Sequence, residues 1–209
     1  MRDRPVTVSR PTLREQQAKL KEDAILQAVN TLLAERGYDL MTVDAVAAFV
    51  GIAKASLYKM FDSKEALAAA ALTRLLERTL EVIALQPASA RPLDKLRAVV
   101  RWALAQHLQG QMPLLPSTRS TLREALVRHR PYMDRLMEVS DRLGAWIEAA
   151  QSDGSLDPNL PAEAVLYTLY ARACDPVADY LKLAGNYTDE QIVDIILATC
   201  FGGLEARGR

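Results

Sequence analysis

Five polar side chains that could contact phosphate groups or nucleotide bases lie in one short segment of the chain. The segment is GIAKASLYKMFDSKEAL, residues 51–67, in which apolar residues recur at helical spacing. A lysine ammonium binds phosphate as a point charge, and serine and tyrosine hydroxyls donate hydrogen bonds to base edges or phosphate oxygens. The chemistry that this pattern favours is binding of a nucleic acid. The side chains are Lys54, Ser56, Tyr58, Lys59 and Lys64.

The residues around these side chains predict two short helices joined by a tight turn. Ala47 is small enough for the helices to cross closely, and Gly51 allows the backbone to reverse. Ile52 and Leu57 would pack inward and fix the angle of the second helix. Its outer face, which begins at Lys54, is then free to enter a major groove. This arrangement is a helix-turn-helix.

Helical spacing continues along almost the whole chain and strand signals are nearly absent, so we predict an all-α fold. A first helix should end at Gly37, and Thr42 is a good N-cap for the next one. Asp62 with Glu65 predicts a capping box at the start of a long helix that runs to Gln86 without glycine or proline. This long helix would connect the N-terminal unit to the rest of the chain.

We expect three parts: a flexible arm at 1–18, a helix-turn-helix DNA-binding domain at 19–65, and a larger helical domain for effector binding and dimerisation at 66–209. Two interpretations of the basic arm remain open. It could reach into a minor groove, as some N-terminal arms do, or it could be a solvated tail. Its arginines are Arg2, Arg4, Arg10 and Arg14.

The last two helices are predicted at 162–184 and 189–205. Pro176 should kink or split the first of them, and Thr188 with Gln191 forms a capping box for the second. The final helix is apolar on two stripes, of which one core seam explains only one, so a second subunit could cover the other. This predicts a homodimer through the last two helices. The stripes are Ile192, Ile195, Ile196 and Thr199, and Val193, Leu197, Cys200 and Leu204.

Composition limits the classes of protein that this chain can be. The 26 basic and 26 acidic residues balance, so any nucleic-acid binding must come from a local patch. Cys174 and Cys200 form no disulfide framework, and they are either ordinary buried thiols or a redox switch across a subunit interface. No apolar run could span a bilayer, and the N-terminus has no apolar signal core. We therefore expect a cytoplasmic protein without membrane contact.

Catalytic and metal-binding patterns are missing from the sequence. His107 and His129 lie far apart without the ligand spacing of a metal site. There is no Ser–His–Asp or Cys–His arrangement and no glycine-rich phosphate loop. We predict no enzyme activity, no metal and no cofactor.

Residues 25–67, ILQAVNTLLAERGYDLMTVDAVAAFVGIAKASLYKMFDSKEAL, resemble the DNA-binding domain of the TetR family of transcriptional regulators. The matching pieces include ERGY at 35–38, GIAK at 51–54 and SKEAL at 63–67. Many positions agree in order and spacing, although the segment covers only about a fifth of the chain. The length and helical character of the remainder are also similar to that family.

The resemblance implies particular DNA contacts. Thr42, Tyr58 and Lys64 stand where family members hold the phosphate backbone, and the recognition helix would face the groove at Lys54, Ala55, Ser56 and Lys59. Two departures affect this site. Met60 replaces the usual His or Tyr before Phe61, and Ala53 stands where a serine often caps the recognition helix.

The resemblance also implies a pocket for a small-molecule effector between the middle helices. Few charges fall on the inner faces there, so a largely apolar or aromatic ligand fits best. This implies a homodimeric repressor that the ligand releases from a palindromic double-stranded DNA operator. The alternative is an activator, or a repressor that responds to a protein partner instead of a small molecule. The pocket candidates are Trp102, His107, Met137, Trp146 and Tyr170.

Overall fold

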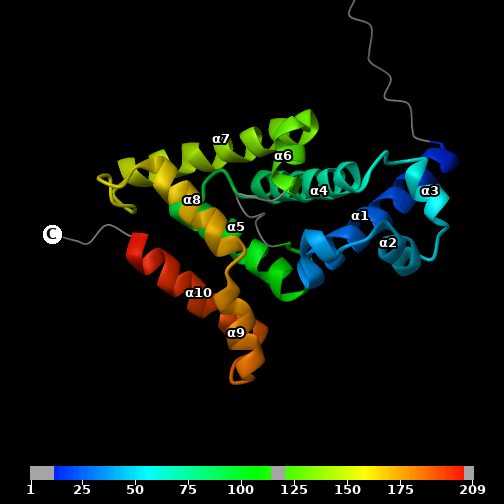
Figure 1. Ribbon diagram of the computed structural model, residues 1–209. Helices are drawn as coiled ribbons and strands as arrows, with labels where there is room; N and C mark the ends of the chain where they lie inside the picture. Colours follow the sequence, from blue (N-terminus) through cyan, green and yellow to red (C-terminus); the bar gives the residue numbers. More distant parts are fainter. Residues whose placement is uncertain (1–11, 114–120, 205–209) are drawn as a thin grey trace, which may run out of the picture.

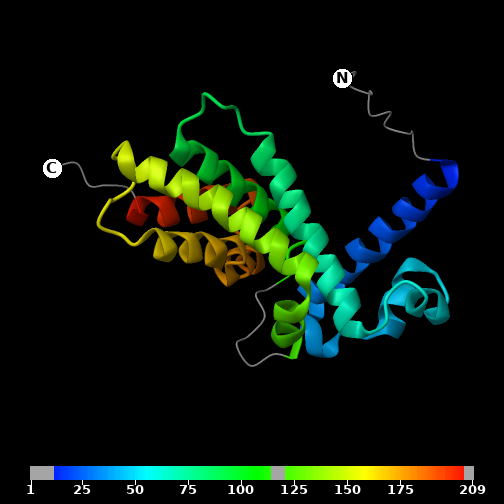
Figure 2. The same ribbon diagram turned by 90° about the horizontal axis from the view of Figure 1, so that it is seen from above.

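The computed structural model describes residues 12–113 and 121–204 of the chain. These residues form ten helices and no strand, which confirms the predicted all-α fold. Figures 1 and 2 show α2 and α3 at one end of the molecule and α9 and α10 toward the other, with α4 running between the two parts. The helices are α1 (Leu13–Leu40), α2 (Val43–Val50), α3 (Lys54–Tyr58), α4 (Lys64–Ala84), α5 (Pro92–Leu108), α6 (Thr121–Arg128), α7 (Arg130–Ser152), α8 (Ala162–Ala173), α9 (Pro176–Ala184) and α10 (Asp189–Leu204).

Helix α1 begins earlier than expected. Thr12 caps it in a capping box with Glu15, so residues 13–18 are helical and the predicted arm at 1–18 is too long. Gly37 interrupts α1 at a positive φ of 73°, at the position predicted for the end of the first helix. Arg14 lies on α1, and the other three arginines of the predicted arm lie outside the described residues.

The turn between α2 and α3 has the predicted chemistry. The Thr42 hydroxyl accepts a hydrogen bond from the Ala45 backbone N–H at 3.1 Å, which confirms Thr42 as an N-cap. Gly51 takes the left-handed conformation at φ 74°, and the N–H of Ile52 closes the turn on the Ala47 carbonyl at 3.0 Å. The recognition helix therefore leaves α2 at a fixed angle.

The prediction that Asp62 caps α4 is wrong. Ser63 takes the extended N-cap conformation, and its hydroxyl accepts from the Ala66 backbone N–H at 3.0 Å. Because the cap lies one residue later, Glu65 is not at the third position of the helix and cannot close a capping box. Its carboxylate accepts instead from the Tyr38 hydroxyl, at 2.6 Å.

The first hydrophobic cluster lies beneath the helix-turn-helix. It includes the buried faces of α1 and α2, Leu57 of α3, and α4 as far as Ala71. Leu122 and Leu126 of α6 also belong to it, although they lie far along the chain. The predicted domain boundary after residue 65 therefore does not coincide with the edge of this cluster.

The second cluster joins α5, α7, α8 and α10 with the end of α4. Pro176 splits the predicted helix at 162–184, as expected, and the Asp175 side chain caps α9 by accepting from the Val177 N–H at 3.0 Å. Thr188 and Gln191 exchange the two hydrogen bonds of the predicted capping box. No helix in the described parts of the chain is long and apolar enough to span a bilayer.

The expectation that only one stripe of α10 is covered within the chain is wrong, so the stripes do not require a second subunit. Members of both stripes are buried within the single chain, because α10 packs against α5, α8 and α9 together. Ile195 is half-buried and Thr199 is exposed. The buried members are Ile192, Ile196, Val193, Leu197 and Cys200.

Candidate nucleic-acid interface and internal cavity

The outer face of α3 is exposed and polar. Leu57 is the only buried residue of this helix, at 1% exposure. Helical geometry places Ala55 nearly opposite Leu57, with Tyr58 beside Ala55 and Lys54 at the edge of the buried side, and Lys59 continues the exposed face just past the end of the helix. All four are exposed, whereas Ser56 is half-buried. The side chains predicted to meet DNA are thus mostly accessible from one direction.

Lys54 has a partner in the free protein. Its ammonium lies 2.8 Å from Oδ2 of Asp44, in the first turn of α2. The hydrogen bond with Asp44 raises the pKa of Lys54. Both side chains are exposed, and exposed ion pairs of this kind contribute little free energy. Lys54 can therefore exchange Asp44 for a base or a phosphate at small cost, and the pairing holds the side chain near the face that would meet DNA.

A second group of phosphate-binding candidates lies at the start of α4. The Lys64 ammonium lies 4.2 Å from the centre of the Tyr38 ring and 3.4 Å from the carbonyl oxygen of Asp39. The first-turn N–H groups of α4 carry the positive end of the helix dipole. Thr42 uses its oxygen as a cap acceptor, which leaves its O–H able to donate to a phosphate. Together these groups favour an anion.

An internal cavity of about 150 Å³ lies between α4, α5, α7 and α8. Of the five predicted pocket residues, Trp102 and Tyr170 line it. The other lining residues are mostly aliphatic. They are Leu72, Leu75, Leu76, Thr79, Leu96, Val99, Val100, Ala103, Met112, Pro113, Tyr132, Leu136, Val139, Leu143, Leu169, Ala173 and Cys174.

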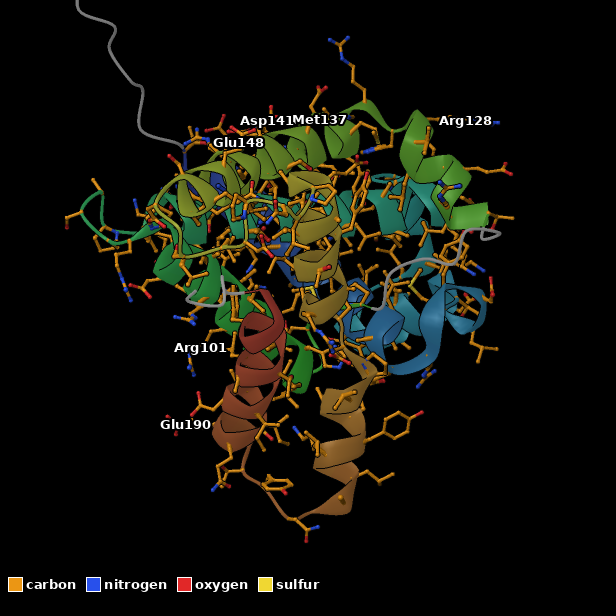
Figure 3. All side chains as sticks on the ribbon, turned by 90° about the vertical axis from the view of Figure 1, so that its left-hand side faces the viewer. Arg101, Arg128, Met137, Asp141, Glu148 and Glu190 are labelled. Carbon is orange, nitrogen blue, oxygen red and sulfur yellow. The ribbon has the colours of Figure 1, made fainter. Side chains whose placement is uncertain are left out.

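Three predicted pocket residues do not line this cavity. Met137 is 55% exposed and lies on the outer side of α7, away from the cavity (Figure 3). His107 is buried beyond it, where its Nε2 lies 3.1 Å from Oδ1 of Asp179 on α9. Trp146 packs against the second cluster, with the Lys95 ammonium 5.6 Å from its ring. Aromatic character alone therefore did not identify the lining.

The described residues that line the cavity supply polar groups but no ionised side chain. Burial raises the pKa of the Tyr132 and Tyr170 hydroxyls, so both stay neutral. The Tyr170 hydroxyl lies 2.9 Å from Oγ of Ser140 on α7. The site can hold a neutral, largely apolar molecule and orient it with one or two hydroxyl groups.

The prediction did not include the face that α4 turns toward the cavity. Leu72, Leu75, Leu76 and Thr79 line it at i, i+3, i+4 and i+7. This spacing is visible in the sequence, but it marks any core face equally well. Only the gap left between four helices distinguishes it from ordinary packing.

The two cysteines lie in different surroundings in the structure. The Cys174 thiol lies at the cavity and donates to the Pro113 carbonyl at 3.4 Å, and burial raises the pKa of the Cys200 thiol. Neither cysteine forms a disulfide within the chain. Within residues 12–113 and 121–204, no group of three His, Cys, Asp or Glu side chains could hold a metal ion.

A helix-turn-helix with an exposed polar recognition helix defines a DNA-binding protein. Residues 25–71 match the family described as "Bacterial regulatory proteins, tetR family". The chain is 26% identical over 163 residues to the HTH-type transcriptional regulator TcmR of Streptomyces glaucescens, covering 74% of this chain and 72% of TcmR. It is 48% identical over 46 residues to IcaR of Staphylococcus aureus (strain Newman), a negative transcriptional regulator of a biofilm operon. That match covers 22% of this chain and 25% of IcaR.

The fold extends the similarity to nearly the full chain. The fatty acid degradation regulator FadR of Bacillus halodurans superposes with a TM-score of 0.67 and 20% identity, covering 90% of this chain and 97% of FadR. The chain is thus similar to the TetR family of transcriptional regulators, through the family match over residues 25–71 and the similarity to TcmR. These findings support a DNA-binding transcriptional regulator.

Proposed function

We propose that the protein is a cytoplasmic, homodimeric repressor that a small, largely apolar or aromatic ligand releases from a palindromic operator. One observation carries the proposal: α4 begins at Lys64 on the DNA-facing side and lines the cavity from Leu72 to Thr79. A ligand that displaces α4 therefore moves a candidate phosphate contact. Ligand binding in the cavity and release of the DNA are therefore coupled through the single helix α4.

The size of the cavity supports this coupling. About 150 Å³ is room for a molecule the size of a single aromatic ring. A larger ligand fits only if the surrounding helices separate, and packed helices respond by shifting as units. A ligand that binds the shifted state about a hundredfold more tightly changes the free-energy difference between the two conformations by ~2.7 kcal/mol.

The homodimer would use the exposed faces of α8 and α10, because most residues of the two apolar stripes are buried within the chain. Helices α8 and α10 lie against each other, and their outer faces carry small exposed residues, which allow close approach of a second helix pair. A four-helix interface would set the distance between two recognition helices, roughly 34–36 Å for successive major grooves. The residues are Ala164 and Ala171 on α8, and Ala198, Thr199 and Gly202 on α10.

A regulator that responds to a protein partner, either as activator or as repressor, is the second candidate. Its support is the exposed apolar side of α9, where Tyr180 is 70% and Leu183 is 86% exposed. Such a protein needs no ligand in the cavity. Binding of small molecules to the cavity, with an effect on operator affinity, distinguishes the two candidates.

Selection of bound oligonucleotides from a random duplex pool tests the proposal directly. A homodimer should select a palindrome, and sedimentation should show two subunits per duplex. Saturating operator should then weaken ligand binding by the same factor as ligand weakens operator binding. A protein that stays a single subunit and retains no selected sequence over scrambled competitor would contradict the proposal.

Replacing Lys64 by alanine should weaken binding to every DNA sequence. Loss of one phosphate contact lowers the slope of log K against log salt by about 0.9. Fluorescence anisotropy on operator and scrambled duplexes across a salt series measures both effects. Lys95→Ala, which removes a lysine of α5 far from the DNA-facing end, is the matched control and should leave the slope unchanged. An unchanged slope in Lys64→Ala would remove Lys64 from the phosphate contacts.

Replacing Lys54 by alanine should act differently, because this side chain lies on the recognition helix. Loss of a base-edge contact costs about 1–3 kcal/mol on the operator and relaxes base preference at one position. Repeating the oligonucleotide selection with the variant shows which position is relaxed. Equal losses on operator and scrambled DNA would place Lys54 on a phosphate instead.

A further inference from the structure

Two opposite charges stand side by side where α4 begins. Lys64 is the first residue of the helix and Glu65 is the second. A phosphate that approaches the Lys64 ammonium also approaches the Glu65 carboxylate, and like charges repel at this range. The site can favour phosphate only if the two side chains are held in different directions.

Tyr38 contacts both side chains. Its hydroxyl donates to Oε1 of Glu65 at 2.6 Å, and its ring lies 4.2 Å from the Lys64 ammonium. The aromatic ring packs against the first hydrophobic cluster, directly after the break in α1 at Gly37. Tyr38 is therefore anchored from below while its two functional contacts lie at the start of α4.

The Tyr38 hydroxyl is held in its protonated form and the Glu65 carboxyl in its ionised form, as this hydrogen bond requires. Burial and the neighbouring Glu65 raise the pKa of Tyr38, so its hydroxyl remains a donor. The hydrogen bond from Tyr38 lowers the pKa of Glu65, so the carboxylate stays ionised and accepts. The contact is thus a charge-assisted hydrogen bond throughout the ordinary pH range.

We propose that Tyr38 is a positioning residue for the phosphate contact of Lys64: its ring holds the ammonium in place, and its hydroxyl holds the Glu65 carboxylate away from the DNA. The proposal rests on the proposed function, because it requires that the start of α4 meets a phosphate. Tyr38 itself does not touch the DNA in this arrangement. It acts through Lys64 and Glu65.

Four proteins test the proposal: wild type, Tyr38→Phe, Glu65→Gln and the double variant. Phenylalanine keeps the ring against Lys64 but releases the carboxylate, so binding should weaken about fivefold on all sequences. Glutamine keeps an acceptor for the Tyr38 hydroxyl but removes the negative charge, so binding should be as tight as wild type or tighter. In the Glu65→Gln background, Tyr38→Phe should then change affinity less than about twofold, since no carboxylate remains to be released.

Tyr38→Leu extends the test to the ring. It removes the contact with the ammonium, so its salt slope should fall toward that of Lys64→Ala, whereas Tyr38→Phe should keep the wild-type slope. Anisotropy titrations on the selected operator measure affinity and slope, and the melting temperature of each variant reports folding separately. A residue that matters only for folding would change the melting temperature without this dependence on Glu65.

The outcomes are distinct. Equal losses from Tyr38→Phe with and without the Glu65→Gln substitution, or no loss in either case, would overturn the role of Tyr38 and leave DNA binding intact. Wild-type protein that binds no duplex at any salt concentration would overturn both this role and the proposed function. A loss only where the Glu65 carboxylate is present supports Tyr38 as the positioning residue.

Discussion

Replacing Leu57 by alanine should lower the free energy of unfolding by about 2–5 kcal/mol and abolish selective operator binding. Leu57 is the only buried side chain of α3. The helix has five residues, and Ala53 supplies no side-chain cap, so α3 has little stability of its own. Without the leucine, α3 loses its one buried anchor, and the exposed Lys54–Asp44 ion pair is too weak to fix the angle at which Lys54 and Tyr58 meet a groove.

Urea denaturation followed by circular dichroism, at one fixed protein concentration, measures the loss of stability. Met60→Ala is the matched control. It removes a long apolar side chain from the adjacent turn, but Met60 is 39% exposed, so stability should change by less than about 0.5 kcal/mol. A loss below about 1 kcal/mol in Leu57→Ala, with base preference retained, would show that α3 is held by other contacts.

Features set by local chemistry were predicted from the sequence. Thr42 caps α2 because a hydroxyl at that position satisfies a first-turn N–H, and Gly51 reverses the chain because its φ is positive. Pro176 splits a helix because it has no N–H to donate. Each of these depends on residues only a few positions apart, and the same is true of the helix-turn-helix motif.

Features set by distant residues were not predicted. Tyr38 and Glu65 are 27 residues apart, and their hydrogen bond exists only after α1 and α4 pack together. Two neighbouring residues, Asp62 and Ser63, both have side chains that can cap a helix, and the extended backbone at Ser63 decides between them. The stripes of α10 are a third example, because a helix with three neighbours in its own chain needs no second subunit to bury them.

The cavity is the least predictable feature, because its shape depends on the distances between four helices. Aromatic residues were the expected lining, yet aliphatic side chains form most of it, and Met137 lies outside. A periodic apolar face indicates burial but carries no information on whether the partner face fills the space completely. Ligand binding to this cavity therefore needs a direct test.

Replacing Ala103 by phenylalanine should abolish binding of small aromatic molecules to the cavity. Ala103 is buried and lines the cavity beside Leu75 and Met112, so a phenyl group added there occupies the space a ligand would need. Toluene is a suitable probe, since it is neutral and of the size that the wild-type cavity admits. At about 100 times its dissociation constant, a ligand that binds only the folded state adds ~2.7 kcal/mol of stability.

For a chain of this length, that stabilisation raises the melting temperature by roughly 5–10 °C. We expect the rise in wild type and in Ala145→Phe, which adds the same ring to the exposed side of α7, and no rise in Ala103→Phe. Toluene fits without separating the helices, so operator binding by wild type should change little, and Ala103→Phe should keep the operator with or without toluene. Equal stabilisation of both variants would place the binding site elsewhere.

A wild-type protein that toluene does not stabilise would change the choice between the two candidate functions. If toluene leaves the melting temperature unchanged, the cavity does not bind a neutral ligand of the size that it admits without a helix shift. The coupling through α4 would then lack an input from a small molecule, and the exposed side of α9 around Tyr180 and Leu183 would become the better candidate for the regulatory contact. This result would favour a regulator controlled by a protein partner over a repressor released by a single-ring ligand.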